Sequence, residues 1–479
     1  MATPTFLWHD YETFGADPRR DRPAQFGALR TDWNLQPIGE PLVLHCQPAS
    51  DTLPSPDACL ITGITPQHCA RVGRSEAEFA AAVHEAMAEP GTCAVGYNSI
   101  RFDDEFTRHL LYRNFHDPYA REWAEGNSRW DLIDLARLAC SLRPQGLRWP
   151  QREDGAPSFR LGDLTAANGI AHGNAHDALS DVEATLGLAR LLRAAQPRLY
   201  DWYLSLRDKK RALELLDWRQ MKPLLHVSSR YPARRHCLAV VAPVAPVPGR
   251  PNEIVVYDLA VDPTPFLQLD LDGLHDRLYT ARADLPEDEQ RLPLKTVKAN
   301  RSPALAPLSV LEGVDLARIG VDLDLALRHA ARLREAPGLS ARLGALYAPA
   351  QAQPAADVEL ALYDGFLPDA DKPLLREVRA ARPAQLAALG ARFRDPRYAE
   401  LLFRYRARNW PQSLSADEHA RWQGLRRDRL LGRSTAVVLG IDAYRARIAE
   451  LRAGADGPRQ AILDALEAWG DTLTGDLDP

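Results

Sequence analysis

The residue pattern changes twice along the 479-residue chain, and these changes constrain its fold more than any other feature. Over residues 1–196, strand-like and helix-like segments alternate, which indicates an α/β layer. Over 197–350, strand-like runs are separated by turns rich in proline and glycine, and we expect a small β-barrel with flanking helices. Over 351–479 the pattern is amphipathic helix. We therefore predict three domains, with breaks at Pro197 and in the Ala, Gln and Pro segment 348–356.

Hydrophobic periodicity also places individual elements. Strands have apolar residues at a period of two, and helices at a period near 3.6. The expected strands are Thr5 to Glu12, Ala24 to Arg30, Ile38 to Gln47, Cys93 to Tyr97, Ala239 to Val247, Glu253 to Leu259 and Leu292 to Lys298, and the expected helices are Glu76 to Ala88, Asp131 to Leu142 and Ala178 to Ala195.

Composition narrows the class of protein. The net charge of −5, from 59 basic and 64 acidic residues, argues against a protein that coats nucleic acid without specificity, because such binding needs excess Lys and Arg. Any nucleic-acid site must then be a local basic groove. The six cysteines form neither a C-x-x-C pair nor a disulfide framework. No apolar stretch reaches the ~20 residues that span a bilayer, and no secretion signal is present. We expect a cytoplasmic protein without a membrane anchor.

The first chemical signal is a pair of acids at the end of the first strand. Asp10 and Glu12 stand two positions apart, so their side chains point to the same side of that strand. Two carboxylates at this distance repel each other unless cations lie between them. A solvated strand end with two surface acids is the alternative, and this motif alone does not decide between the two interpretations.

The second signal is Asp103, which follows an apolar strand and a polar turn and is itself followed by two more acids. We place it at the start of a helix. An aspartate there is commonly a helix cap, and in isolation capping explains Asp103 better than catalysis does.

The third signal surrounds the start of the helix at Ala178. His176 precedes this helix and Asp181 lies in its first turns, so both side chains can point to one place beyond the N-terminus. Asp177 and Asp181 are also neighbours at i and i+4. The alternative is a surface histidine with two aspartates that interact with the helix dipole.

Together these signals match a known pattern. Asp10, Glu12, Asp103, His176 and Asp181 resemble, in order and spacing, the acid set and histidine of the DnaQ-like exonucleases of the DEDDh type. The resemblance implies a ribonuclease-H-like mixed sheet with flanking helices. Four hard oxygen donors are what two Mg²⁺ ions require, and the absence of a Cys/His set argues against zinc.

A closer resemblance extends through all three predicted domains. It is carried by His9 to Gly15, Arg22 to Phe26, Leu60 to Gln67, Arg101 to Glu105, Asn127 to Leu132, Pro157 to Leu161, Gln220 to Leu224 and Tyr405 to Asn409. These strings are similar to the bacterial exodeoxyribonuclease I family. The resemblance implies an exonuclease domain at 1–196, an SH3-like domain at 197–350 and a helical C-terminal domain at 351–479.

The same resemblance implies an activity. We expect a 3′→5′ exonuclease that is specific for single-stranded DNA, releases 5′-mononucleotides and acts in DNA repair and recombination. Asp10, Glu12 and Asp181 would hold two Mg²⁺ ions, for which Mn²⁺ can substitute, with Asp103 beside them or reaching a metal through water. His176 would take the proton from the attacking water.

Cationic and aromatic residues interleave between the second and third acid motifs, as they do in single-strand binders. A buried aromatic cluster with solvated arginines would give the same pattern. In the middle domain, the basic run at Lys209 is equally consistent with a solvated helix face. By resemblance, the expected substrate contacts are Glu12, Arg108, Tyr119, Trp123, Arg137, Arg143 and Arg160, followed by Lys209, Asn300 and Arg301 in the middle domain.

The resemblance also implies a protein partner. Relatives look as though they are recruited by the acidic C-terminal tail of the single-stranded DNA-binding protein, and such a tail needs a basic, partly apolar pocket. Lys222, Leu327 and Arg334 are the candidates for it, with Trp202 and Arg143 as further members. Scattered surface residues are the alternative. We expect a monomer whose partners are single-stranded DNA and this tail.

Two other functions remain open from the sequence. A DnaQ-like 3′→5′ exoribonuclease could share all five catalytic residues, and an inactive nucleic-acid-binding scaffold could share the fold. Intact acids and histidine argue against the scaffold. All five residues precede Pro197, so the later domains are not needed to supply a catalytic group. We expect them to form a second wall of the DNA groove, through Lys209, Arg301 and the row Arg404, Arg406 and Arg408 beside Trp410.

Overall fold

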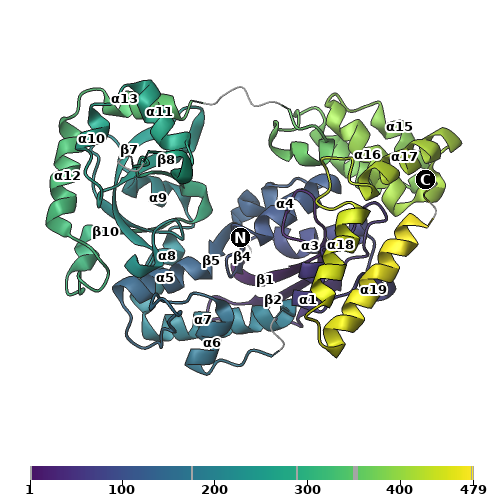
Figure 1. The fold of residues 1–479 in the computed structure, drawn as a ribbon, viewed down its shortest axis with the longest axis horizontal. Coiled ribbons are helices and arrows are strands. Elements are labelled where there is room, and N and C mark those ends of the chain that lie inside the picture. Colours follow the sequence, from purple (N-terminus) through teal and green to yellow (C-terminus); the bar gives the residue numbers. More distant parts are fainter. Residues whose placement is uncertain (1–2, 174–175, 287–289, 349–353, 476, 478–479) are drawn as a thin grey trace. The chain divides into compact units, whose positions relative to one another are not determined.

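The computed structural model describes residues 3–173, 176–286, 290–348, 354–475 and 477. Their contacts form two compact units (Figure 1). The first unit combines Met1–Ser128, His172–Glu183 and Gln353–Pro479. The second combines Arg129–Ala171 and Ala184–Ala352. The N-terminal and C-terminal parts of the sequence therefore belong to one unit.

A mixed sheet lies in the first unit. Strand β1 (Thr5–Thr13) pairs antiparallel with β2 (Pro23–Thr31), which pairs antiparallel with β3 (Leu42–His45). On its other side β1 pairs in parallel with β4 (Thr92–Gly96). The mixed sheet confirms the expected α/β class, and the expected strands at β1, β2 and β4 are present within a residue or two.

Strand β3 is shorter than the predicted Ile38 to Gln47. The chain turns at Gly39, whose φ is +72°, a backbone conformation that glycine adopts without strain. Pro41 follows and has no amide hydrogen to donate to a neighbouring strand. Apolar alternation alone did not reveal this interruption.

Helices flank the sheet at the predicted places. Helix α3 (Glu76–Ala88) begins at a capping box formed by Ser75 and Glu78 and leads into β4. Helix α4 (Asp103–Arg113) follows β4, and α7 (Ala178–Ala195) begins in the first unit. The bounds of α3 and α7 agree with the sequence prediction.

The C-terminal part of the chain is helical, as expected. Helices α18 (Ile441–Arg452) and α19 (Gly457–Thr474) lie side by side (Figure 1). Apolar side chains of this part join N-terminal ones in shared cores, such as Phe14 with Tyr444. The other principal C-terminal helices are α14 (Lys372–Ala380), α16 (Pro396–Asn409) and α17 (Ala416–Leu430).

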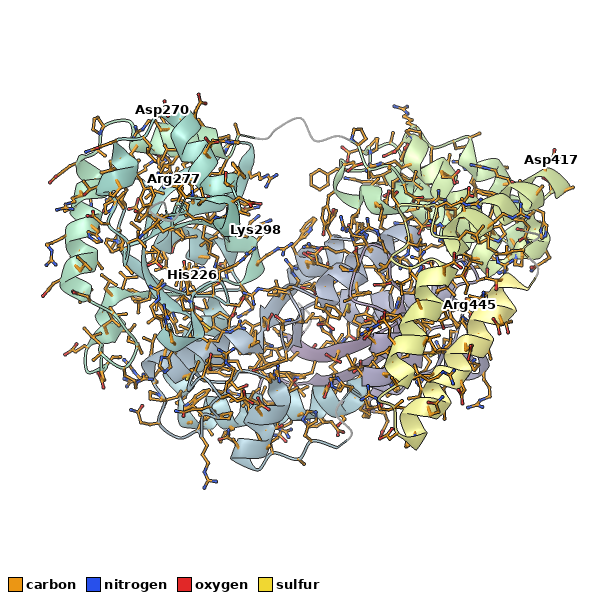
Figure 2. All side chains as sticks on the ribbon, viewed as in Figure 1. His226, Asp270, Arg277, Lys298, Asp417 and Arg445 are labelled. Carbon is orange, nitrogen blue, oxygen red and sulfur yellow. The ribbon has the colours of Figure 1, made fainter. Side chains whose placement is uncertain are left out.

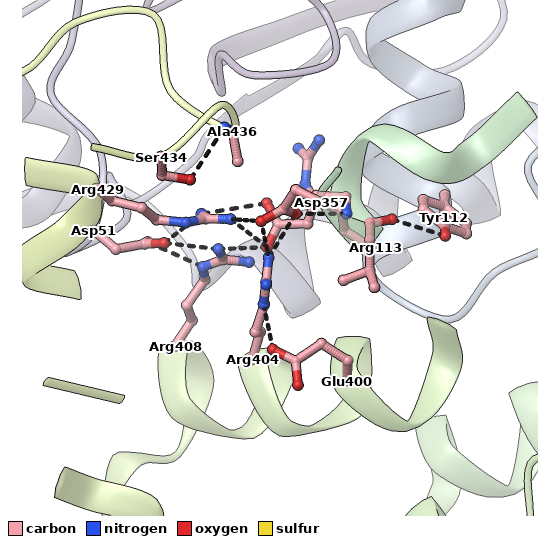
Figure 3. A network of polar contacts seen from close by, with 12 residues as sticks. Asp51, Tyr112, Arg113, Asp357, Glu400, Arg404, Arg408, Arg429, Ser434 and Ala436 are labelled. Carbon is pink, nitrogen blue, oxygen red and sulfur yellow. Dashed lines mark hydrogen bonds and ion pairs between the residues drawn. The ribbon is translucent and has the colours of Figure 1, made fainter. Parts of the chain in front are cut away.

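A buried network of charges joins the same two parts of the first unit (Figure 3). Asp51 and Glu359 are 0% and 1% exposed. Arg408 contacts Asp51 at 2.7 Å and Glu359 at 2.6 Å, and Arg429 contacts Asp51 at 2.6 Å. Arg22 reaches Glu359 at 2.7 Å. Burial alone would raise the pKa of Asp51 and Glu359, but the arginines outweigh it and lower both.

The second unit contains a five-stranded antiparallel sheet in the order β10-β6-β7-β8-β9. It confirms the β-rich middle region. On β6, His226 is buried and its Nε2 lies 2.7 Å from Nζ of Lys295 (Figure 2 labels His226). The strands are β6 (Leu224–Val227), β7 (Leu238–Val247), β8 (Arg250–Asp258), β9 (Leu294–Lys298) and β10 (Ala304–Pro307).

Helices also belong to the second unit. Helix α5 (Leu132–Leu142) is capped by Asp131 and confirms the prediction there. Helix α12 (Leu323–Glu335) follows the sheet. Of the predicted linker 348–356, residues 349–353 lie outside the described part of the chain. Among the helices that are described, none is long and apolar enough to cross a membrane. All six cysteines are buried free thiols.

Candidate active site

Three of the predicted catalytic residues come together in the first unit. Glu12 lies near the end of β1, His176 precedes α7, and Asp181 lies in the first turns of α7. One ligand atom from each lies within 4.8 Å of the other two. Two carboxylates and an imidazole at this distance can hold a divalent cation.

Asp103 contacts the same strand through a backbone amide. It is the first residue of α4, and its Oδ1 accepts a hydrogen bond from the Tyr11 amide at 3.0 Å. The pairing of β1 with β4 ends at Trp8 and Val95, so Tyr11 lies beyond it. The N-cap position of α4 is Phe102, and Asp103 is the residue after it. Asp103 therefore contacts the strand between Asp10 and Glu12 through the Tyr11 amide.

The start of α7 separates the roles of its two aspartates. Asp177 is the helix cap, since its Oδ1 accepts a hydrogen bond from the Ser180 amide at 3.1 Å. Asp181 lies one turn later, and its Oδ1 is 2.5 Å from Nε2 of His172. His176 is exposed and has a φ of +67°, a left-handed conformation that is uncommon for residues other than glycine. The helix-dipole alternative thus holds for Asp177.

The acids of the site disfavour one another's ionised form. Burial raises the pKa of Glu12 to about 8, and the charges of Asp181 and Asp177 add to the effect. Burial also raises the pKa of Asp10, with further contributions from Asp103 and Glu12. Within the described residues, no Lys or Arg forms an ion pair with Asp10 or Glu12. A bound cation would supply the missing positive charge.

Family comparisons agree with this site. Residues 7–189 match the model of the family "Exonuclease", residues 207–349 the "Exonuclease I SH3-like domain" and residues 356–473 the "Exonuclease I C-terminal domain". Exodeoxyribonuclease I of Escherichia coli K12 is 48% identical over 424 residues, which cover 88% of this chain and 89% of that protein. The Haemophilus influenzae protein is 42% identical and covers 89% and 90%. The chain belongs to the exodeoxyribonuclease I family.

Solved structures of the family have the same fold. Exonuclease I of Methylocaldum szegediense has a TM-score of 0.94 and 49% identity, covering 98% of this chain and 99% of that one. E. coli exonuclease I in complex with a dA16 oligonucleotide has a TM-score of 0.93 and 45% identity, covering 98% and 100%. A further E. coli complex contains zinc. As a member of the exodeoxyribonuclease I family, the chain is a nuclease that hydrolyses phosphodiester bonds, and the carboxylate and histidine cluster indicates dependence on a divalent metal.

Two expected DNA-contacting residues of this exodeoxyribonuclease I family member line a cavity of the first unit. The cavity has a volume of about 190 Å³ and is lined by Tyr119, Trp123 and Phe366 among others. Trp123 is 69% exposed and Phe366 is 86% exposed. The rings of Tyr119 and Phe366 lie 5.9 Å apart. Phe366 could not be found from the sequence, since a single aromatic residue in a loop has no periodic signal.

Arg108 is placed differently from a free DNA-binding cation. It is buried, its guanidinium contacts Glu122 at 2.7 Å and Glu105 at 3.0 Å, and it lies 5.5 Å from the ring centre of Tyr119. Its charge is thus balanced by carboxylates. The contacts of Arg108 suit it to holding Tyr119 in place.

The remaining expected substrate residues lie in the second unit. Arg137 is buried and paired with Asp134 at 2.6 Å. Arg143 donates to the Val310 carbonyl at 3.0 Å. Arg160, Lys209 and Asn300 are exposed and Arg301 is partly exposed.

The three expected partner residues also lie in the second unit. Lys222 and Arg334 are exposed, and Leu327 is 42% exposed. Leu327 and Arg334 are seven residues apart on α12, which is two helical turns, so they share one face. Two further members of the partner site were expected. Arg143 donates to the Val310 carbonyl, and Trp202 donates its indole hydrogen to the Leu305 carbonyl at 2.8 Å.

Proposed function

We propose that this exodeoxyribonuclease removes nucleotides one at a time from the 3′ end of single-stranded DNA in repair and recombination. Its product would be a 5′-mononucleotide. The observation that carries the proposal is the cluster of Glu12, His176 and Asp181 beside acids with raised pKa, in a chain of the exodeoxyribonuclease I family.

The oxygen donors at the site suit Mg²⁺, with Mn²⁺ as a substitute. Asp10, Glu12 and Asp181 would hold two ions, with Asp103 beside them. When bound, two such ions stabilise the charge on the attacking and leaving oxygens of the phosphodiester. His176 would accept the proton of the attacking water. Its exposure and its place near Glu12 and Asp181 support this role.

Substrate binding would use exposed rings and cations. Tyr119 and Trp123 line an open cavity in which bases could stack, at ~1–3 kcal/mol per base. Arg160, Lys209, Asn300 and Arg301 would contact phosphates, while Arg108, Arg137 and Arg143 would act by holding neighbouring groups.

We divide the chain into an exonuclease domain at 1–196, an SH3-like domain at 197–350 and a helical domain at 351–479.

One assay tests this function. Single-stranded and duplex DNA of the same sequence, labelled separately at the 3′ and 5′ ends, are incubated with and without Mg²⁺, together with a matched RNA strand. We expect the 3′ label of single-stranded DNA to be released first, as a mononucleotide, and only with the metal. Equal degradation of the RNA would favour the exoribonuclease alternative, and no release from any strand would favour the scaffold.

Three residues of the middle domain offer a test of DNA contacts in the second unit. Each phosphate contact adds about 0.7 to the log–log salt dependence of single-strand binding. The triple variant Lys209→Ala, Asn300→Ala, Arg301→Ala should therefore bind with a shallower salt slope and release fewer nucleotides per encounter when excess unlabelled DNA traps the freed enzyme. An unchanged slope and run length would show that these residues do not contact the strand.

The partner proposal concerns α12 and its surroundings. Lys222, Leu327 and Arg334 would bind the acidic C-terminal tail of the single-stranded DNA-binding protein, with the enzyme as a monomer. We expect the double variant Lys222→Ala, Arg334→Ala to lose affinity for a synthetic tail peptide. Arg328→Ala is the matched control, because Arg328 is also exposed on α12 but faces another direction. Equal loss in both variants would point to a general charge effect.

A further inference from the structure

One side chain of the sheet holds the start of α7. Gln25 lies on β2 and is 4% exposed. Its Oε1 accepts a hydrogen bond from the Ala178 amide at 3.0 Å, and its Nε2 donates to Oδ2 of Asp177 at 3.1 Å. One amide group therefore satisfies a backbone donor at the helix start and the free oxygen of the capping carboxylate.

The helix also lies directly against the backbone of the same strand. Gly27 is two residues after Gln25, so both positions face the same side of the sheet. A Cβ at Gly27 would lie 2.6 Å from the backbone of both Ala178 and Leu179. Such a contact does not occur in real proteins, and any larger residue would push the first turn of α7 away.

Strand register connects this anchor to the acids. On β1, Glu12 is directly opposite Gln25, and Asp10 is directly opposite Gly27. Directly opposite residues of paired strands project from the same face. Each acid of β1 is thus beside the β2 residue that contacts the helix start. Asp181 lies one turn beyond Asp177 in that helix, joined to it by a backbone hydrogen bond of 3.0 Å.

We propose that Gln25 is a positioning residue that sets the distance between the Glu12 and Asp181 carboxylates, with Gly27 providing the close approach. This inference rests on the proposed function, because it assigns both carboxylates to a divalent cation. Gln25 itself does not touch substrate or metal. It acts through Asp177 and Ala178, and partners that orient metal ligands in this way typically change metal affinity by about 10–100-fold when removed.

Metal binding without DNA is the direct test. We expect Gln25→Ala to lower the affinity for Mn²⁺, measured by calorimetry, by about 10–100-fold. The concentration of Mn²⁺ needed for half-maximal cleavage should rise with it, while KM for single-stranded DNA at saturating metal stays near the parental value. Gly27→Ala should act in the same direction by displacing the helix. Gln36→Ala is the control, since Gln36 is exposed in the turn after β2.

A charge-conserving exchange separates positioning from general stability. Gln25→Glu combined with Asp177→Asn keeps the total charge and the side-chain sizes, and it reverses donor and acceptor in the hydrogen bond between the two residues. The substituted carboxylate can still accept from the Ala178 amide, and Asn is a good helix cap. We expect this double variant to bind Mn²⁺ nearly as tightly as the parent, and tighter than Gln25→Ala does.

The outcomes are distinguishable. Parental Mn²⁺ affinity in folded Gln25→Ala, with only a lower Tm, would show that Gln25 has a purely structural role and overturn the inference. If Gln25→Ala does not fold, the test rests on the double variant Gln25→Glu, Asp177→Asn. Weak Mn²⁺ binding by this double variant in its folded state would also overturn the inference. No Mn²⁺ binding by the parent would instead refute the proposed function, and this inference with it.

Discussion

The first unit holds two groups of buried or partly buried carboxylates, and their surroundings shift the pKa in opposite directions. At the candidate active site, burial and neighbouring acids raise the pKa of Asp10 and Glu12. In the charge network, arginines outweigh burial and lower the pKa of Asp51 and Glu359. Both groups are largely removed from water, so the neighbouring charges decide the difference.

The contrast separates a structural site from a functional one. Carboxylates paired with arginine inside a protein are satisfied without any ligand, and removing one partner leaves a buried charge. Carboxylates that repel each other inside a protein are unfavourable until a cation or proton arrives, which is why shifts of this kind concentrate at functional sites. The following predictions test whether the two groups differ in this way.

The largest effect is expected at the acids themselves. Asp10→Asn or Asp181→Asn should abolish detectable nucleotide release, since each disturbs the binding of a metal that contributes several kcal/mol to transition-state stabilisation. Each substitution also removes a repelling charge, so the Tm without metal should be equal to or above that of the parent. A clear drop in Tm would show that these acids stabilise the fold as the network does.

A smaller effect is expected at the histidine. His176→Ala should lower the rate at saturating Mg²⁺ by roughly 10²–10⁴-fold, the usual effect of losing a general base. Binding of single-stranded DNA, measured by fluorescence anisotropy in Ca²⁺, should remain nearly unchanged. Cleavage at the parental rate from neutral to mildly alkaline pH would show that another group takes the proton.

A substitution in the charge network should lower the free energy of unfolding without changing the catalytic rate. Glu359→Gln leaves buried arginines without a full counter-charge and should lower the free energy of unfolding by about 3–5 kcal/mol, measured with urea. Glu377→Gln is the control, because its ion pair with Arg392 is exposed and such pairs contribute about 0–1 kcal/mol. The rate per folded molecule should stay parental. Equal destabilisation by Glu359→Gln and Glu377→Gln would show that the buried network stabilises the fold no more than an exposed ion pair does.

The smallest effect concerns pH. The pKa of Glu12 is raised from 4.5 to about 8, so without a cation the stability contributed by this group falls as pH rises from 4.5 to 8. Mg²⁺ competes with the proton, and it should raise the Tm more at pH 8 than at pH 6. Glu12→Gln should remove most of this difference. An equal Mg²⁺ effect on the parent at both pH values would contradict the raised pKa.

Much of the catalytic part could be predicted from the sequence. The strand that carries Asp10 and Glu12 and the helix that carries Asp181 have strong local periodicity, and both form where that periodicity placed them. The order of the acids and His176 then indicated the family. Their catalytic roles and the three domain boundaries stay predictions, while the grouping of Glu12, His176 and Asp181 is a property of the structure.

The sequence was least informative where a side chain finds a distant partner. Arg108 was expected to contact DNA, and its guanidinium also donates a hydrogen bond to the Tyr363 hydroxyl, 255 residues along the chain. Gln25 stood in a recognised string without an assigned role, and its hydrogen bonds to Asp177 and Ala178 cross 152 and 153 residues. Spacing along the chain does not encode such pairs.

The sequence by itself determined the local elements, the acid set and the family of this chain, because periodicity and ordered motifs are properties of neighbouring residues. It also implied that residues after Pro197 are not needed to supply a catalytic group. Only the tertiary structure decided that residues from 353 onward complete the unit that holds the acids. Arg408 meets Asp51 across 357 residues of sequence. A buried charge needs an opposite charge beside it. Packing in three dimensions, and not spacing along the chain, decides which residue supplies that charge.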